Sequence, residues 1–207
     1  MKIKICGMKY PGNIRQISLL EPDYMGFIFY EKSKRFVGEP EVINIPEHIK
    51  KVGVFVNEKV SVILEQVKKY KLDVVQLHGN ETPQDCKLFR ENNCTVIKAF
   101  QIDENFSFSV LDDYESVTDY FLFDTKTENY GGSGVSFNWD LLKKYTNTTP
   151  FFISGGLGPG TIDELLQLKH PMLYGADFNS MLELEPGLKA IGRSELIINK
   201  IRNHVYI

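Results

Sequence analysis

The sequence predicts an α/β protein that forms a single-domain (β/α)8 barrel, the TIM barrel, over residues 1–207. Eight short runs rich in β-branched and aromatic residues recur along the chain, with starts roughly 22–32 residues apart. This spacing fits a strand, a helix and two loops. Segments with helical periodicity lie between the runs, and no low-complexity or Ser/Pro-rich linker divides the chain.

The expected strands follow one another at regular intervals, and each is followed by a more polar segment. They are Lys2–Cys6, Tyr24–Phe29, Lys51–Val56, Asp73–His78, Thr95–Phe100, Asp119–Asp124, Phe151–Ser154 and Leu173–Asp177. An open doubly wound sheet permits the same alternation. Eight units and two late glycine-rich loops favour the closed barrel. Because 207 residues is near the short limit for this fold, some helices should be minimal, and residues 11–20 and 103–114 are the weakest candidates.

The clearest helices show apolar residues at i, i+3, i+4 and i+7, with Glu and Lys on the other face. Asn57 and Thr82 stand where helix N-caps are expected. The apolar positions are Val60, Ile63, Leu64 and Val67, then Ile162, Leu165 and Leu166, then Leu196, Ile197 and Ile201.

Charge and cysteine content exclude several classes of protein. Lys and Arg total 24 against 27 for Asp and Glu, and this balance argues against a nucleic-acid partner. No stretch approaches the roughly 20 apolar residues that cross a bilayer, and the first residues do not resemble a signal peptide. Three cysteines without a Cys-x-x-Cys pair indicate a reducing compartment. We therefore expect a cytoplasmic protein with no membrane partner.

In a barrel of this class the active site forms where strands end and the following loops begin. Gly155 and Gly156 follow the seventh expected strand, and Asn179 and Ser180 follow the eighth. Glycine backbone can approach a ligand closely and direct N–H groups at it, and loops after strands 7 and 8 commonly bind phosphate. The alternative is a glycine-rich turn that serves chain reversal alone.

Cys6 and Asp124 are the candidate proton carriers. Side chains alternate across a strand, so Lys4 and Cys6 share the face opposite Ile3 and Ile5, which should pack against helices. Asp124 ends an apolar strand at the same rim. A carboxylic acid can donate a proton and a thiolate can accept one. For Cys6 the alternative is simple packing, because cysteine is often buried.

Arg35 and His78 also follow expected strands. The planar guanidinium of Arg35 suits a carboxylate, although a solvated basic loop with Lys32 and Lys34 is the alternative. His78 stands without a His/Cys/Asp cluster beside it, so a structural role is favoured and no metal site is expected.

Motifs along nearly the whole chain, in the correct order, resemble the phosphoribosylanthranilate isomerase family, which performs the Amadori step of tryptophan biosynthesis. The matching segments are Lys4-Ile5-Cys6-Gly7, Gly26-Phe27-Ile28-Phe29-Tyr30 with Lys32-Ser33 and Arg35, Val54-Phe55-Val56-Asn57, Val75-Gln76-Leu77-His78-Gly79, Asp124 with Gly131-Gly132-Ser133-Gly134, Ser154-Gly155-Gly156-Leu157, and Asp177-Phe178-Asn179-Ser180 with Glu183, Pro186-Gly187 and Lys189.

The resemblance implies a (β/α)8 enzyme that converts N-(5-phosphoribosyl)anthranilate, a small phosphoribosyl substrate, to its 1-deoxyribulose phosphate product. It implies no cofactor and no metal, and the sequence leaves a monomer or a homodimer open. The positions that match functional residues are Cys6 as general base, Asp124 as general acid, Arg35 for the anthranilate carboxylate, Gly155, Gly156, Asn179 and Ser180 for phosphate, and Asp177 among the substrate-binding residues.

The implied chemistry fits these residue types. Asp124 would protonate the furanose oxygen to open the ring, and Cys6 would then remove the C2′ proton. Nearby lysines would favour the thiolate. The chain departs from the family pattern at four places, at Lys34, Asn138-Trp139, Met181 and Ala190. Lys34 and Met181 bear on the geometry of two site loops.

Two other readings remain open at this point. Another phosphosugar barrel is one: the histidine-pathway isomerase uses an aspartate where this chain has Cys6, and epimerases need metal-binding His and Asp residues that are not found at suitable strand ends. A non-catalytic binder of phosphorylated ligands is the other, and it would leave the pairing of Cys6 with Asp124 unexplained.

Overall fold

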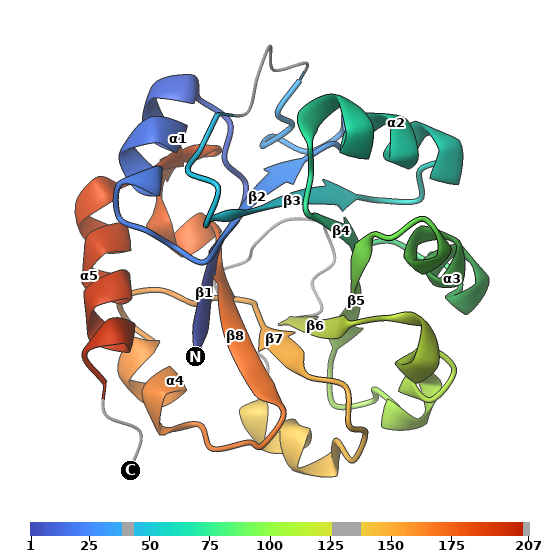
Figure 1. The fold of residues 1–207 in the computed structure, drawn as a ribbon. Helices are drawn as coiled ribbons and strands as arrows, with labels where there is room; N and C mark the ends of the chain where they lie inside the picture. Colours follow the sequence, from blue (N-terminus) through green and yellow to red (C-terminus); the bar gives the residue numbers. More distant parts are fainter. Residues whose placement is uncertain (39–43, 126–137, 205–207) are drawn as a thin grey trace.

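Eight parallel strands close into a barrel with helices around it, as the computed structural model shows for residues 1–38, 44–125 and 138–204 (Figure 1). The strands are β1 (Lys2–Ile5), β2 (Tyr24–Ile28), β3 (Lys50–Phe55), β4 (Val74–Leu77), β5 (Thr95–Ile102), β6 (Tyr120–Thr125), β7 (Phe151–Ile153) and β8 (Leu173–Phe178). Each expected strand is present, with bounds that differ by at most two residues. The expectation of a closed barrel is confirmed.

The barrel closes where β1 meets β8. Lys4 is the register partner of Asp177 across this seam, and every neighbouring pair of strands is parallel. Parallel strands all end at the same rim, so the side chains that follow them gather there.

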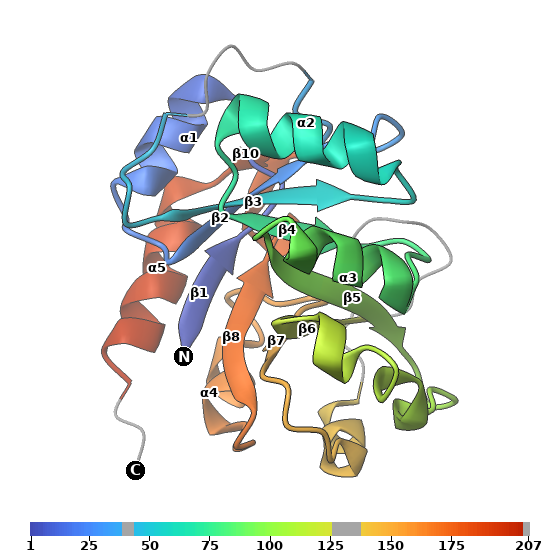
Figure 2. The ribbon, with the colours of Figure 1, turned by 45° about the vertical axis from the view of Figure 1, so that its right-hand side comes forward.

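The helices form the outer layer, with α5 at the end of the chain lying beside α1 near its beginning (Figures 1 and 2). Residues 11–20 were expected to be a weak helix, yet α1 covers most of them, and Pro11 suits its first turn. Residues 103–114 hold one 3-10 turn, as that expectation implied. The bounds are α1 (Pro11–Ser18), α2 (Val60–Tyr70), α3 (Pro83–Glu91), α4 (Ile162–Gln167) and α5 (Ile191–Arg202), with 3-10 turns η1 (Phe108–Leu111), η2 (Glu115–Val117), η3 (Trp139–Lys144) and η4 (Ser180–Leu182).

One of the two expected helix caps is confirmed. Thr82 caps α3 through a reciprocal pair of hydrogen bonds with Asp85. Asn57 does not cap α2, whose N-cap residue is Lys59. Asn57 instead adopts a left-handed conformation (φ 53°), and its side-chain oxygen accepts a hydrogen bond of 2.6 Å from the backbone of Asn80. Sequence position alone did not separate a cap from a turn residue.

The core has two layers. The inner cluster lies inside the barrel and consists of alternate residues of the strands. The larger outer cluster fills the space between the strands and the helices. Ile3 and Ile5 belong to the outer layer and Cys6 to the inner one, as alternation predicts. Leu196 was expected on the buried face of α5, but it is 43% exposed. The inner cluster consists of Cys6, Tyr24, Val52, Val54, Val74, Ile97, Ala99, Leu122 and Phe152.

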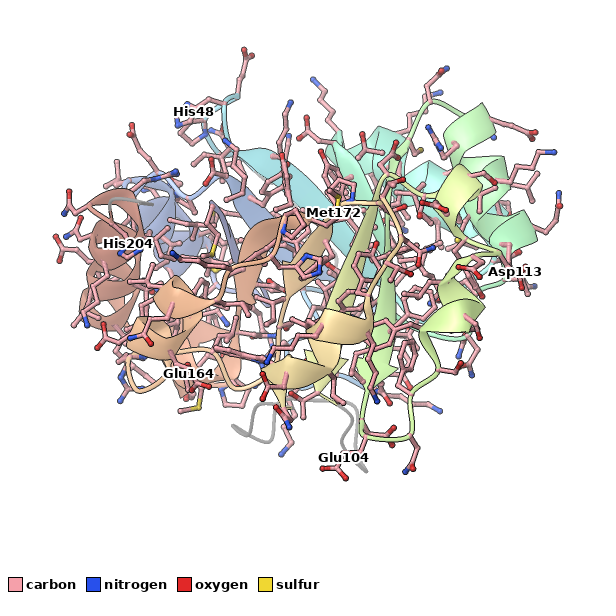
Figure 3. The ribbon with its side chains drawn as sticks, turned by 90° about the horizontal axis from the view of Figure 1, so that it is seen from below. His48, Glu104, Asp113, Glu164, Met172 and His204 are labelled. Atoms are coloured by element: carbon pink, nitrogen blue, oxygen red, sulfur yellow. The ribbon has the colours of Figure 1, made fainter. Side chains whose placement is uncertain are left out.

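The end of the barrel where the strands finish carries an additional hairpin. His48, shortly before β3, lies at the top of the view from below in Figure 3, and Glu104, shortly after β5, lies at the bottom. A small antiparallel sheet of β9 (Glu183–Glu185) and β10 (Leu188–Lys189) follows β8 at the carboxyl end. The candidate site lies at this end.

Candidate active site

A cavity of about 80 Å³ opens at the carboxyl ends of the strands. It contains seven of the eight site residues expected from the sequence, and Arg35 is the exception. Residues within or directly after seven of the eight strands contribute to it, which is the arrangement that parallel closure produces. The lining consists of Cys6, Ile28, Val54, Gln76, His78, Asp124, Ser154, Gly155, Gly156, Leu157, Asp177, Asn179 and Ser180.

Cys6 follows β1 directly, and its side chain enters the barrel where Gly26 of β2 leaves room. A Cβ at Gly26 would lie 2.6 Å from the sulfur, so only glycine fits there. Burial raises the pKa of the Cys6 thiol, although Lys4 and Lys189 act in the opposite direction. The lysines therefore lower the pKa of Cys6, as expected. Burial raises it by more, so the resting group is a thiol.

Lys4 and Asp177 form a buried ion pair directly below Cys6. The ammonium nitrogen lies 2.9 Å from Asp177 Oδ2, and the Lys4 side chain is fully buried. Burial by itself would lower the pKa of Lys4, but Asp177 and Cys6 outweigh it and raise that pKa, so the ammonium keeps its charge. Asp177 Oδ1 is buried and has no hydrogen-bond partner within the described residues.

Asp124 is the next-to-last residue of β6 and lies beside His78 at the cavity. His78 Nε2 lies 3.4 Å from Asp124 Oδ2, and its Nδ1 lies 2.9 Å from Gln76 Nε2. The Gln76 amide nitrogen can only donate, so Nδ1 accepts and the neutral ring carries its proton on Nε2, facing the carboxylate. The sequence favoured a structural role for His78, whereas the structure places it beside the candidate acid.

Arg35 does not line the cavity, but it lies next to it. Its guanidinium forms two hydrogen bonds to Glu183, from Nε to Oε1 at 2.8 Å and from Nη2 to Oε2 at 2.7 Å. A Cβ at Gly7 would lie 2.8 Å from Arg35 Cδ and 2.6 Å from Asn179 Oδ1, so Arg35 and Asn179 flank the residue that follows Cys6. Arg35 is thus paired with an internal carboxylate and is not part of a solvated loop.

The loops after β7 and β8 meet at one side of the cavity. Gly155 and Gly156 both have positive φ, 88° and 66°, and a side chain at Gly155 would collide with Thr125. Asn179 and Ser180 face them from the next loop. The departure at Met181 stays outside the cavity, because its side chain packs over Gly158 and is 38% exposed. The expected Gly131–Gly134 segment falls outside the described residues.

Sequence reasoning missed several residues around the cavity. Lys4 had a usable signal, since alternation places a lysine inside the barrel, where a charge requires a partner. Gln76 had the same signal on β4. Glu183 and Lys189 belong to the family motifs, but their contacts with Arg35 and Asn13, 148 and 176 residues away, had no signal in the sequence.

Two further properties of the described residues bear on what the site can hold. Within residues 1–38, 44–125 and 138–204, no three His, Cys, Asp or Glu side chains come together as a metal ion would need. None of the helices in those ranges has the length and apolar character that a membrane span requires.

The fold and the cavity define a protein of the (β/α)8-barrel class with ionisable side chains gathered at the carboxyl ends of its strands. The family model for "N-(5'phosphoribosyl)anthranilate (PRA) isomerase" matches residues 3–201. The N-(5'-phosphoribosyl)anthranilate isomerase of Parabacteroides distasonis is 45% identical over 206 residues, which cover 97% of this chain and 93% of the relative. The corresponding enzyme of Phocaeicola vulgatus is 44% identical and is covered over its full length, as is 99% of this chain.

Solved structures agree with the sequence comparisons. Phosphoribosyl anthranilate isomerase from Thermotoga maritima superposes with a TM-score of 0.85 at 29% identity, covering 99% of this chain and 100% of that one. A structure of such an isomerase with reduced 1-(o-carboxyphenylamino)-1-deoxyribulose 5-phosphate gives 0.80 at 26% identity, with the same coverage. The chain belongs to the N-(5'-phosphoribosyl)anthranilate isomerase family. It is an isomerase of tryptophan biosynthesis, as the motifs implied.

Proposed function

We propose that the chain performs the Amadori rearrangement of N-(5-phosphoribosyl)anthranilate with Cys6 as base and Asp124 as acid. The observation that carries these roles is that a thiol after β1 and a carboxyl group on β6 line the same small cavity. The expected product is the 1-(2-carboxyphenylamino)-1-deoxyribulose 5-phosphate.

The two steps move protons without an external oxidant or reductant. Asp124 donates a proton to the ring oxygen, the C1′–O bond breaks, and the nitrogen lone pair forms a Schiff base. The Cys6 thiolate then takes the proton from C2′, and the electrons of that bond give an enolamine that tautomerises to the ketone. Each positioned acid or base contributes about 10²–10⁴-fold.

The proposed second step needs Cys6 as a thiolate, whereas burial raises the pKa of its thiol. The thiol must therefore lose its proton before it can act as the base. Lys4 and Lys189 supply the positive charge that stabilises the thiolate once it forms.

The substrate is held at its two ends. The backbone of Gly155 and Gly156, with Asn179 and Ser180, suits the phosphate, and Asp177, which also lines the cavity, suits a ribose hydroxyl. Arg35 suits the anthranilate carboxylate, since Glu183 takes one edge of its guanidinium and leaves other N–H groups. Fixing both ends places the sugar between Cys6 and Asp124.

The experiment is the loss of fluorescence of freshly prepared N-(5-phosphoribosyl)anthranilate on addition of the purified chain. Turnover is expected in the wild type, with no added metal or cofactor. A protein that binds the product analogue but leaves the substrate fluorescence unchanged would be a binder, and the proposal would fail.

Two broader properties belong with this proposal. We place the enzyme in the cytoplasm, which suits three cysteines that are all free. The sequence is compatible with a monomer and with a homodimer. A Thermotoga maritima relative is described as a dimeric isomerase from which monomers were generated. Light scattering of the purified protein distinguishes the two states.

A further inference from the structure

A hairpin added after the last barrel strand sends a carboxylate back toward the second strand. β9 pairs with β10 in antiparallel fashion, and Gly187 (φ 91°) turns the chain between them. Glu183 begins the hairpin, and its side chain is 5% exposed. A buried carboxylate is costly unless every oxygen is satisfied.

Glu183 is satisfied by several donors. Its Oε1 accepts from Arg35 Nε at 2.8 Å, from Lys189 Nζ at 2.7 Å and from the Gly187 backbone at 3.0 Å. Its Oε2 accepts from Arg35 Nη2 at 2.7 Å. Burial raises the pKa of Glu183, but Arg35 and Lys189 outweigh it and hold that pKa below its usual range. The group is therefore a fixed anion.

Lys189 fixes Glu183 from the other side. The Lys189 backbone is bonded in both directions to the Asn13 side chain, at 2.8 Å and 2.9 Å. Its ammonium also donates to Asn179 Oδ1 at 2.7 Å. The carboxylate that holds Arg35 is thus anchored to α1 and to the loop after β8, and neither anchor is an exposed, flexible side chain.

This anchoring leaves the other N–H groups of the Arg35 guanidinium unused by Glu183. A guanidinium has five N–H groups in a rigid fork, and Glu183 takes one on Nε and one on Nη2. The second Nη2 hydrogen and both Nη1 hydrogens have no acceptor among the described residues, and together they form a second edge suited to a planar carboxylate.

We propose that Glu183 is a positioning residue that locks one edge of the Arg35 guanidinium and so orients the other edge toward the aromatic carboxylate of the substrate. This inference rests on the proposed role of Arg35. Pre-orientation matters because a clamp that is misplaced by about 1 Å can cost up to about 10²-fold. The β9–β10 hairpin then determines how well the enzyme recognises a carboxylated ring.

The test compares two ligands on the same protein preparation. One is the reduced 1-(o-carboxyphenylamino)-1-deoxyribulose 5-phosphate, and the other is the same compound with a plain phenylamino group. The Kd of the compound without the carboxylate, divided by the Kd of the carboxylated compound, measures carboxylate recognition. This ratio does not depend on the folded fraction. We expect Glu183→Gln to lower this ratio about tenfold or more, with little change for the compound that lacks the carboxylate.

The matched control is Glu185→Gln, which removes the same charge from the exposed end of the same strand. It should leave both affinities within about twofold. Glu183→Asp keeps the charge that neutralises Lys189 and withdraws the oxygens by one methylene, so it serves if the Gln variant fails to fold. It should also lower the ratio.

Two results would overturn the inference: equal weakening of both ligands by the Glu183 variants, which indicates a structural role alone, or no change in either affinity. Arg35→Met in the same assay separates the two proposals. If Arg35→Met keeps the ratio, the carboxylate role of Arg35 fails. If Arg35→Met brings the ratio to about one while the Glu183 variants keep the wild-type ratio, only the positioning role fails.

Discussion

Lys4 on β1 and Asp177 on β8 are register partners across the seam of the barrel, and their side chains form an ion pair of 2.9 Å within the barrel. The pair joins the first strand to the last directly below the candidate base. Burial raises the pKa of Cys6, and the positive charge of Lys4 lowers it more than that of Lys189 does. The same pair therefore bears on stability and on the reactivity of the thiol.

Lys4→Met is expected to slow the reaction of Cys6 with iodoacetamide at neutral pH and to shift its pH profile upward, because the thiolate loses its main compensating charge. The measurement is the alkylation rate of Cys6, followed by mass spectrometry of its peptide. The variant also leaves Asp177 unpaired, so the free energy of unfolding should fall by about 3–5 kcal/mol. Lys143→Met, which breaks an exposed pair with Asp140, is the control and should change stability by about 0–1 kcal/mol. An unchanged pH profile in the Lys4 variant would remove this lysine from the account.

Asp124→Asn should reduce kcat by about 10²-fold or more, since an amide cannot protonate the leaving ring oxygen. Affinity for the reduced product should stay close to that of the wild type, because the phosphate and carboxylate contacts remain. Steady-state kinetics and a product titration give the two numbers. A variant that retains kcat would assign the acid role to another group, and His78, at 3.4 Å, would be the first candidate.

Arg35→Met should weaken binding of the carboxylated product by about 1.5–3 kcal/mol through loss of charged hydrogen bonds. Part of any loss of stability will come from Glu183, which the substitution leaves with fewer partners. Calorimetric titration measures the first effect and thermal unfolding the second. Product affinity equal to that of the wild type in a folded variant would show that another residue binds the carboxylate.

Cys86 gives the protein a defined weakness at alkaline pH. Burial raises the pKa of this thiol to about 12, so the folded protein keeps it protonated where the unfolded chain ionises it. Because the native state then binds more protons than the unfolded state, the free energy of unfolding should fall as pH rises from about 9 toward 12. The contribution is at most about 1.4 kcal/mol per pH unit.

The measurement is urea unfolding of wild type and Cys86→Ala at several values between pH 8 and 11. The alanine variant loses packing at every pH, so the slopes are compared and not the absolute stabilities. The slope should be shallower in Cys86→Ala. Parallel slopes would mean that the tyrosines with raised pKa, such as Tyr120, account for the whole effect.

The strands and their order were predictable from sequence because each is a local signal, a β-branched run at regular spacing. Cys6 and Asp124 followed from alternation and from the rule that strand ends build the site. Thr82 was predictable for the same local reason, while Asn57 was not, since a left-handed turn residue and a cap have the same composition.

The contacts that sequence reasoning missed are long-range. Arg35 and Glu183 are 148 residues apart, and nothing near either one signals the pairing. Asn13 and Lys189 are 176 apart. His78 looked structural because Asp124, on β6, comes to lie beside it only when β4 and β6 are bent into the same rim. Closure of the barrel creates these relationships, and one strand at a time does not reveal them.

The central claim is that Cys6 acts on a proton and not as packing, and Cys6→Ala tests it most directly. The variant is compared with Cys94→Ala, which removes a thiol at a position outside the cavity. Both kcat on fresh substrate and Kd for the reduced product are measured. The account predicts that Cys6→Ala loses about 10²–10⁴-fold in kcat with little change in Kd, while Cys94→Ala retains both. A Cys6→Ala enzyme with kcat near that of the wild type would contradict it.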